Sequence, residues 1–166
     1  MTGVRKVTVA VCALGLIVAG VVGITVTRGA WEPCTGDQLL EPCLRAMDQP
    51  GQLVTLQMLW LLCLGLCVVA LLASSAGRAR TFVVAALILV VVMNAVTEYV
   101  LWLGLAGGHW DVPPGTGYTQ ATAFAVAGAL IAVGAVLPRI RKTGKPPKNR
   151  GLVVGDTGLE PMTSSV

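Results

Sequence analysis

The chain has 166 residues, of which 55% are hydrophobic and 12% are charged, with a formal net charge of +4 at pH 7. Soluble domains carry roughly 25% charged residues, and a soluble chain of this size has no core large enough to hide so many apolar side chains. This composition excludes an ordinary soluble domain and makes the lipid bilayer the first expected partner. The basic residues are not interleaved with aromatic ones, so no nucleic-acid partner is expected.

Four apolar segments, each about 20 residues long, dominate the chain. They cover about residues 7–27, 53–73, 82–106 and 118–137. Each is long enough, as an α-helix, to cross roughly 30 Å of hydrocarbon. We therefore predict an all-α fold, a four-helix transmembrane bundle within residues 1–137. Residues 138–166 are predicted to form a separate tail, first basic and then low in order.

The first apolar segment resembles a secretory signal in beginning after Arg5 and Lys6. Its apolar run is too long for a signal peptide, and Arg28 stands where a cleavage site would need a small residue, so we predict a retained membrane anchor. Gly15, Ala19 and Gly23 recur every four residues. Such a stripe of small residues predicts close packing, and we expect it to face the 82–106 or 118–137 segment of the same chain.

Basic residues gather on one set of alternate flanks of these segments. Two of the twelve Lys and Arg residues, Arg28 and Arg45, lie in the loop after the first apolar segment. The other ten lie in the N-terminus, in the loop between the second and third segments, and in the tail: Arg5, Lys6, Arg78, Arg80, Arg139, Arg141, Lys142, Lys145, Lys148 and Arg150. The positive-inside rule then predicts cytoplasmic N- and C-termini and outward-facing loops at 28–52 and 107–117. All Trp and Tyr residues fall toward the outward half, as an interfacial aromatic belt requires. We expect a multi-pass protein of the plasma membrane.

The first outward loop contains Cys34 and Cys43. Because they share one short loop in an oxidising compartment, we predict that they form a disulfide, the alternative being two free thiols. Its prolines, Pro33, Pro42 and Pro50, predict that the rest of this loop lacks regular structure. The other three cysteines, Cys12, Cys63 and Cys67, fall within apolar segments and are expected to pack as small apolar side chains.

The pattern Trp31-x2-Cys34-x8-Cys43 resembles the first-loop signature of claudin-like tetraspan proteins. Those proteins also have four membrane helices and cytoplasmic termini, so the resemblance implies a role in adhesion. It covers about thirteen residues and the four segments. The family has a longer first loop with a β-sheet ahead of the Trp, whereas Trp31 follows the first apolar segment almost directly. Adhesion is therefore kept as the remotest alternative.

Polar residues interrupt the third apolar segment at Asn94, Thr97 and Glu98. Their spacing predicts one shared helix face, and a carboxylate inside a membrane segment indicates a functional site by default. In the predicted topology, Gln57 enters the membrane to a depth comparable with that of Glu98. We therefore predict an intramembrane polar cluster of these four residues. The residues expected at its outer mouth are His109, Asp111 and Gln120.

Two readings of this polar cluster stay open. In the structural reading, its members hold helices together through polar contacts, each worth about 0.6–2 kcal/mol. In the functional reading, the cluster lines a site that is open to the outside and binds a proton, a cation or a polar head group. No basic residue lies within the apolar segments to pair with Glu98, which slightly favours the structural reading.

The sequence contains no evident catalytic set. His109 is the only histidine, and metal sites usually need several His, Cys or carboxylate ligands, so neither a metal nor another cofactor is expected. The first predicted function is a non-enzymatic accessory, structural or assembly subunit, with a membrane-protein partner or a homo-oligomer. The alternative is a small proton- or cation-coupled carrier or a lipid-binding protein that uses Glu98.

The tail begins with six basic residues between Arg139 and Arg150. Basic residues next to a membrane helix attract anionic lipid head groups, at about 1 kcal/mol each close to the surface. The final stretch, residues 155–166, differs in character from both the membrane segments and the basic run. Its Gly-Leu-Glu-Pro sequence resembles an antisense reading of a tRNA arm, and we hypothesise translational overrun without function.

Overall fold

The computed structural model describes residues 3–36, 39–74, 77–108 and 112–137. All regular structure in these ranges is helical, without any strand. The elements are α1 (Gly3–Trp31), the short 3-10 helix η1 (Glu32–Cys34), α2 (Glu41–Asp48), α3 (Gly51–Ala73), α4 (Arg78–Ala106) and α5 (Tyr118–Val136). By length and composition, α1, α3, α4 and α5 are able to cross a membrane. The predictions of an all-α fold and of four helices of spanning length are confirmed.

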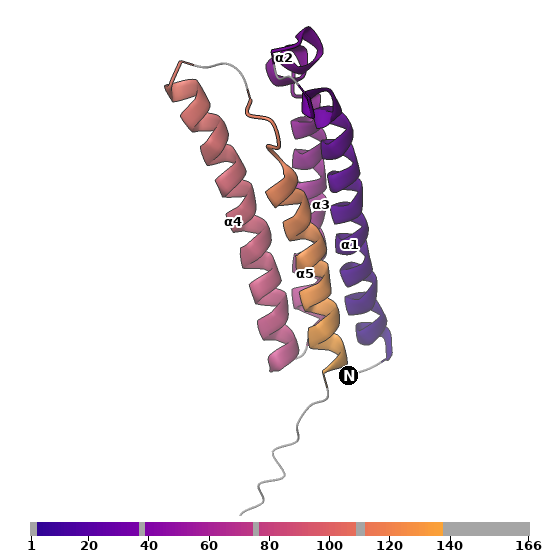
Figure 1. The fold of residues 1–166 in the computed structure, drawn as a ribbon. Coiled ribbons are helices and arrows are strands. Elements are labelled where there is room, and N and C mark those ends of the chain that lie inside the picture. Colours follow the sequence, from indigo (N-terminus) through magenta and orange to yellow (C-terminus); the bar gives the residue numbers. More distant parts are fainter. Residues whose placement is uncertain (1–2, 37–38, 75–76, 109–111, 138–166) are drawn as a thin grey trace, which may run out of the picture.

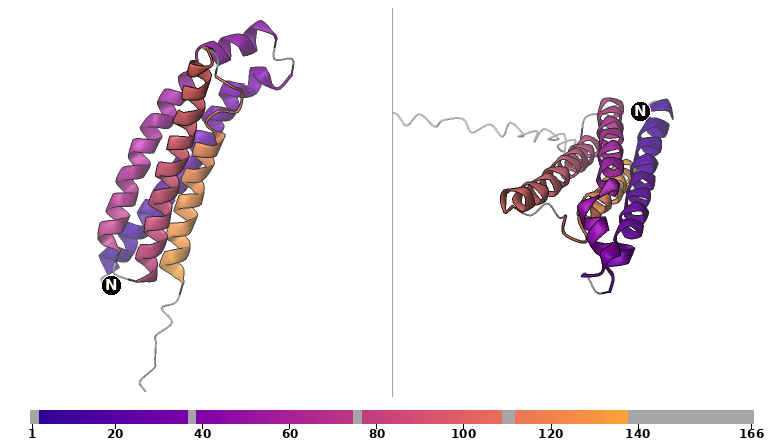
Figure 2. Two further views of the ribbon diagram at one scale, coloured as in Figure 1. Left: turned by 90° about the vertical axis from the view of Figure 1, so that its left-hand side faces the viewer. Right: turned by 90° about the horizontal axis from the view of Figure 1, so that it is seen from above.

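The four long helices run side by side, and α2 lies at one end of them (Figure 1). Both α1 and α4 contact α5 and α3, and α1 contacts α5 most extensively. The start of α1 and the end of α5 lie at the same end, opposite α2 (Figures 1 and 2). That end also holds the start of α4 with Arg78 and Arg80, whereas Arg28 and Arg45 belong to the opposite end. We call the end with Arg28 and Arg45 the outer end; that it faces outward stays a prediction.

The interior between the long helices is filled by small and aliphatic side chains. Leu16 of α1, Cys63 and Cys67 of α3, Val90 of α4 and Phe124 of α5 are all buried there. Both cysteines are free and buried, as is Cys12. Many Val and Leu side chains remain exposed on the surfaces of the long helices that face away from the interior of the bundle. Such surfaces are stable only when lipid or a partner protein covers them.

The closest helix contact joins α1 and α5 at two glycines. A Cβ atom added to Gly20 would lie 2.5 Å from the backbone N of Ala125, and one added to Gly128 would lie 2.6 Å from the carbonyl O of Ala13. Backbone atoms cannot swing aside as a flexible side chain can. These two positions therefore require glycine because the two backbones touch, as in small-residue interfaces of membrane helices.

The predicted small-residue stripe of α1 also packs within the chain. A Cβ atom on Gly23 would lie 3.0 Å from Cβ of Ala121 in α5 and 3.2 Å from Leu56 in α3. Gly15 instead faces Leu66 of α3, at 3.0 Å. The expectation of packing against the 118–137 segment is met at Gly23. At Gly15 the neighbour is the 53–73 segment, which was not expected.

The loop predicted at residues 28–52 is more helical than its prolines suggested. Helix α1 continues through Trp31, and Pro42 lies in the first turn of α2. A proline in the first turn removes an N–H group that would have no helical partner there, so it permits a helix instead of breaking one. The disulfide between Cys34 and Cys43 is confirmed, with Cα atoms 4.8 Å apart.

Two predicted regions lie outside the described residues. They are the tail 138–166, which includes the basic stretch Arg139–Arg150, and residues 109–111, which include His109 and Asp111. The expectations of a low-order tail, of lipid attraction and of outer-mouth residues at those two positions therefore stay predictions.

Candidate functional site

The buried polar contact between the long helices is a hydrogen bond from Gln120 to Asn94. The Nε2 group of Gln120 in α5 donates to Oδ1 of Asn94 in α4 over 2.7 Å. Both side chains are buried, at 2% and 8% exposed. An unpaired amide in such a place would lose its hydrogen bonds with water without compensation, so each residue satisfies the other. Gln120, expected at an outer mouth, instead lies in the interior beside Asn94.

The predicted shared face of α4 divides into a buried and an exposed part. Thr97 is buried, and its Oγ1 donates to the carbonyl O of Met93 at 3.1 Å within the same helix. Glu98, the next residue, is exposed. Among the described residues, the Glu98 side chain has no ion pair and no hydrogen bond. With about 100° of rotation per residue, Glu98 lies near Asn94 around the helix but at the edge of the buried stripe of Val90, Asn94 and Thr97, on the side away from Thr97.

Aromatic side chains accompany Glu98 on the outer part of α4. Tyr99 and Trp102 are 58% and 60% exposed, and their rings stack with centroids 6.2 Å apart. This part of α4 leans away from α1 and α5 (Figures 1 and 2). No residue of α4 beyond Thr97 is buried among those whose exposure is described. The outer part of α4 therefore presents a carboxylate and two aromatic rings to its surroundings.

The polar residues of α3 do not join the Asn94–Gln120 pair through hydrogen bonds. Gln57 is half-buried, and no hydrogen bond of its side chain occurs within the described residues. Gln52 is buried with its Nε2 atom unpaired, and Nε1 of the half-buried Trp60 is also unpaired. Neither Gln52 nor Trp60 was among the predicted site residues. Their burial depends on the rotation of α3 against its neighbours, which no local sequence pattern specifies.

A small cap at the outer end joins the two loops expected to face outward. Trp31, Cys34, Cys43 and Val112 form a separate buried apolar cluster. The Trp31 indole Nε1 donates to the carbonyl O of Thr116 at 3.0 Å. The backbone N of Val112 donates to the carbonyl O of Met47 at 3.1 Å. The Trp and both Cys of the claudin-like signature thus pack together, within a helical first loop.

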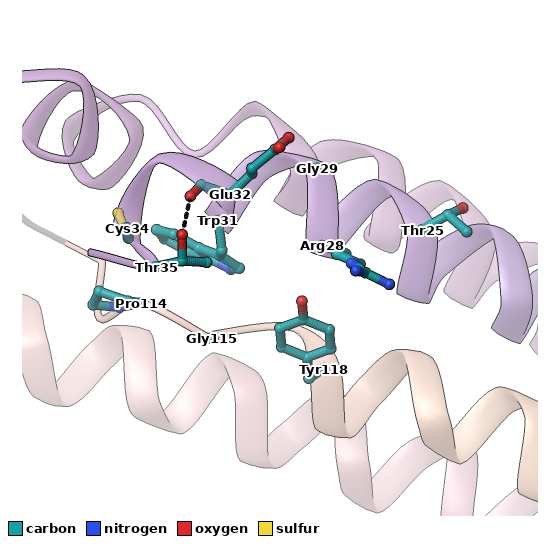
Figure 3. A pocket seen from close by; sticks show the side chains of 10 residues that line it. All are labelled: Thr25, Arg28, Gly29, Trp31, Glu32, Cys34, Thr35, Pro114, Gly115 and Tyr118. Atoms are coloured by element: carbon teal, nitrogen blue, oxygen red, sulfur yellow. Dashed lines mark hydrogen bonds between the residues drawn. The ribbon is translucent and has the colours of Figure 1, made fainter.

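Beside this cap, a hollow of about 770 Å³ opens between the end of α1 and the start of α5 (Figure 3). Arg28 lines it from α1, Glu32 from η1 and Tyr118 from α5. The Arg28 side chain and the Tyr118 hydroxyl extend into the same space (Figure 3). The sequence shows these residues only as separate interfacial groups. Their convergence follows from the contact between α1 and α5.

The described residues contain no candidate metal site. Within the part of the chain that the structure describes, no group of three or more His, Cys, Asp or Glu side chains lies close enough to hold an ion. The chemical groups on offer are instead a buried amide pair, an unpaired carboxylate on α4 and a polar hollow with one guanidinium.

These features define a class of protein: an all-helical chain whose four candidate spanning helices indicate a multi-pass membrane protein, capped at one end by a disulfide-linked loop. Comparison with protein-family models, with curated proteins and with solved structures found no match to this chain.

Proposed function

We propose that this chain is an accessory or assembly subunit of a plasma-membrane complex, which binds a partner membrane protein through the outer part of α4. The observation that carries the proposal is the exposed Glu98 within an apolar helix, a carboxylate that has no partner among the described residues. A carboxylate facing lipid is unfavourable, and membrane segments keep such residues where they pair with another polar group. An interface with a second protein supplies that pairing.

The depth of Glu98 supports a contact inside the membrane. Phe82 opens the apolar part of α4, and Glu98 lies about 24 Å further along the helix axis, given a rise of about 1.5 Å per residue. This distance is within a hydrocarbon layer of roughly 30 Å, close to its outer edge. Tyr99 and Trp102 beside it are residue types enriched at protein interfaces as well as at membrane surfaces.

The partner proposed is a different protein whose membrane helix carries a Lys or Arg in its outer half. The four apolar segments of this chain contain no Lys or Arg between residues 7–27, 53–73, 82–106 and 118–137. A second copy therefore has no basic residue within its apolar segments to offer Glu98. Charge complementarity favours a hetero-oligomer over the homo-oligomer that the composition also allowed.

The alternative of a proton- or cation-coupled carrier, or of lipid binding at Glu98, has less support. Such a site needs the carboxylate in a protected cavity, and Glu98 lies on an exposed helix face and does not line the hollow at the outer end. Claudin-like adhesion rests on the short Trp and Cys signature alone and stays the remotest alternative.

The proposal is tested by site-specific crosslinking in intact membranes. A photo-crosslinking amino acid replaces Ala95, which is exposed on α4 three residues before Glu98. We expect it to capture one basic-helix membrane protein. Glu98→Gln and Glu98→Ala should each reduce capture about tenfold or more, since truncating one partner of a buried charge pair costs roughly 2–5 kcal/mol. Glu98→Lys should restore capture when the partner's basic residue is changed to Glu.

Two controls distinguish the outcomes. The same crosslinker in place of Leu14, exposed on α1, should not capture that protein. Glu41→Gln removes another carboxylate, in an exposed ion pair with Arg45 at the outer end, and should leave capture unchanged. Equal capture with and without Glu98, or capture of a second copy alone, contradicts the proposal. Proton uptake by reconstituted vesicles that depends on Glu98, without any capture, would favour the carrier.

A further inference from the structure

The hollow at the outer end combines a cation, a hydroxyl and an adjoining apolar surface. Arg28 and Tyr118 both line it. Among the described residues, neither the Arg28 guanidinium nor the Tyr118 hydroxyl takes part in an ion pair or a hydrogen bond. Two unpaired donors that face one space suit an oxyanion, because charge-assisted bonds to phosphate are among the strongest polar contacts in proteins.

The walls of the hollow are held in place without any ligand. Trp31 is fixed by its hydrogen bond to the Thr116 carbonyl O, and Cys34 by its disulfide with Cys43. On the opposite wall, Gly115 has a φ of +90°, a left-handed conformation that a glycine adopts without strain. A site that is already formed loses less conformational entropy when it binds a ligand.

An exposed stripe of α1 runs from the hollow along the membrane-facing surface. Arg28, Thr25, Val21, Val18 and Leu14 alternate at three- and four-residue spacing, and all five are exposed. This spacing places them on one helix face, with the polar end at the hollow. The Thr25 hydroxyl donates to the carbonyl O of Val22, so its polarity is already satisfied. An apolar chain placed along this stripe would contact mostly hydrocarbon.

Helix α5 carries a matching stripe below Tyr118. Thr122, Val126, Ala129 and Val133 follow Tyr118 with the same spacing and are exposed. The Thr122 hydroxyl donates to backbone carbonyl groups of its own helix. Because α1 and α5 contact each other over much of their length, the hollow stands above two neighbouring apolar stripes. This combination fits a molecule with a polar head and long apolar chains.

We infer that the hollow binds the head group of a phospholipid. The phosphate lies against Arg28 and the Tyr118 hydroxyl, and the acyl chains lie along the exposed stripes of α1 and α5. Arg28 directly follows an apolar segment long enough to cross the hydrocarbon, so it lies at the level where lipid phosphates are found. Glu32 stands at the rim of the same hollow. Its carboxylate points away from the space shared by Arg28 and Tyr118 (Figure 3), so the phosphate contact rests on Arg28 and Tyr118 alone. This site is separate from Glu98 and independent of the proposed function.

The inference is tested by native mass spectrometry of the full chain released from nanodiscs that contain equal amounts of phosphatidylethanolamine and phosphatidylglycerol. We expect retention of one phospholipid, with either head group, because both carry the phosphate that Arg28 and Tyr118 would bind. Arg28→Gln should lower that retention about tenfold, the effect expected when a charge-assisted hydrogen bond is lost. Tyr118→Phe, which keeps the ring, should lower it less.

Arg45→Gln is the matched control, since Arg45 is the other basic residue of the outer end and is exposed. It should leave lipid retention unchanged. Equal retention by the Arg28→Gln and Arg45→Gln variants overturns the site. Displacement of the lipid by inorganic phosphate or glycerophosphoethanolamine at concentrations that match the intact lipid would show a soluble phosphate ligand and overturn the lipid assignment. Circular dichroism checks that each variant keeps its helices.

Discussion

At the residue scale, the Asn94–Gln120 bond is the side-chain hydrogen bond that joins two long helices within the described residues. The interruption of an apolar segment by Asn94 is visible in the sequence. Its partner is not, because Gln120 lies 26 residues away on a helix whose rotation depends on packing. The pair forms a polar contact between α4 and α5, and its contribution to stability is a prediction.

The pair should show measurable coupling in a double-mutant cycle. We expect Asn94→Ala and Gln120→Ala each to destabilise the protein, because each leaves one buried amide unpaired. The coupling energy should be about 0.6–1.7 kcal/mol, the range found for hydrogen bonds between membrane helices. Unfolding by increasing SDS in mixed micelles, followed by circular dichroism, measures the free energies.

A distant hydrogen bond provides the control for this cycle. The Ser74 hydroxyl donates to the carbonyl O of Ala70 near the inner end of α3. The effects of Ser74→Ala and Gln120→Ala should add, since separated sites without shared partners usually do so within about 0.3–0.5 kcal/mol. Strictly additive effects of Asn94→Ala and Gln120→Ala would show that this hydrogen bond does not hold α4 to α5.

The sequence identifies Glu98 as an unusual residue but does not predict the direction of its side chain. A single acidic residue in an apolar run is recognisable at once as an unusual, costly feature. Whether it points into the protein or away from it depends on how α4 is rotated about its axis against its neighbours, because Glu98 lies at the edge of the buried stripe that contains Asn94 and Thr97. Thr97 is buried and Glu98 is exposed, so Glu98 is available to a partner and does not belong to an internal cluster.

At the element scale, glycine decides how closely α1 and α5 approach. Many glycines stand in the sequence, yet only some meet another backbone. Gly128 faces Ala13 and Ile17 of α1, with a hypothetical Cβ atom 2.6 Å from the Ala13 carbonyl O. Gly65 in α3 has no neighbouring atom within 4 Å of such a Cβ. The amino-acid composition does not distinguish Gly65 from Gly128, and only the helix packing shows which of them contacts another backbone.

We predict opposite effects for alanine at these two glycines. Gly128→Ala should force α1 and α5 apart and lower the free energy of unfolding by about 1–3 kcal/mol, as overpacking does in closely packed interiors. Gly65→Ala should leave stability unchanged or raise it by up to about 1 kcal/mol, because alanine is the better helix former. Unfolding in SDS mixed micelles measures both variants, and equal effects would contradict the packing at Gly128.

At the scale of the whole molecule, the basic residues of the described part of the chain divide unequally between the two ends. Arg5, Lys6, Arg78 and Arg80 belong to the end where α1 begins and α5 finishes, and Arg28 and Arg45 to the other. The positive-inside rule assigns the first of these ends to the cytoplasm. The cytoplasmic position of this end is therefore a prediction from the distribution of basic residues.

Reporter fusions in a bacterial host measure that position. We expect a fluorescent protein fused after the full chain to be fluorescent and alkaline phosphatase at the same place to be inactive, because both termini are predicted to be cytoplasmic. Phosphatase fused after Pro50, beyond the first outer loop, should be active. Active phosphatase at the C-terminus together with inactive phosphatase after Pro50 would contradict the predicted orientation.

The sequence by itself determined the number of long helices, their approximate limits and the Cys34–Cys43 disulfide. These features depend on local composition, on segment length against the thickness of a bilayer, and on two cysteines in one short loop. The sequence did not predict helix α2, because Pro42 is equally compatible with the first turn of a helix and with an irregular loop. The tertiary structure alone decided that Asn94 contacts Gln120, that Glu98 lies on an exposed face of α4, and that Arg28 and Tyr118 line the same hollow. Each of these depends on how helices rotate and lean against one another, and that is set by contacts between residues far apart in the chain.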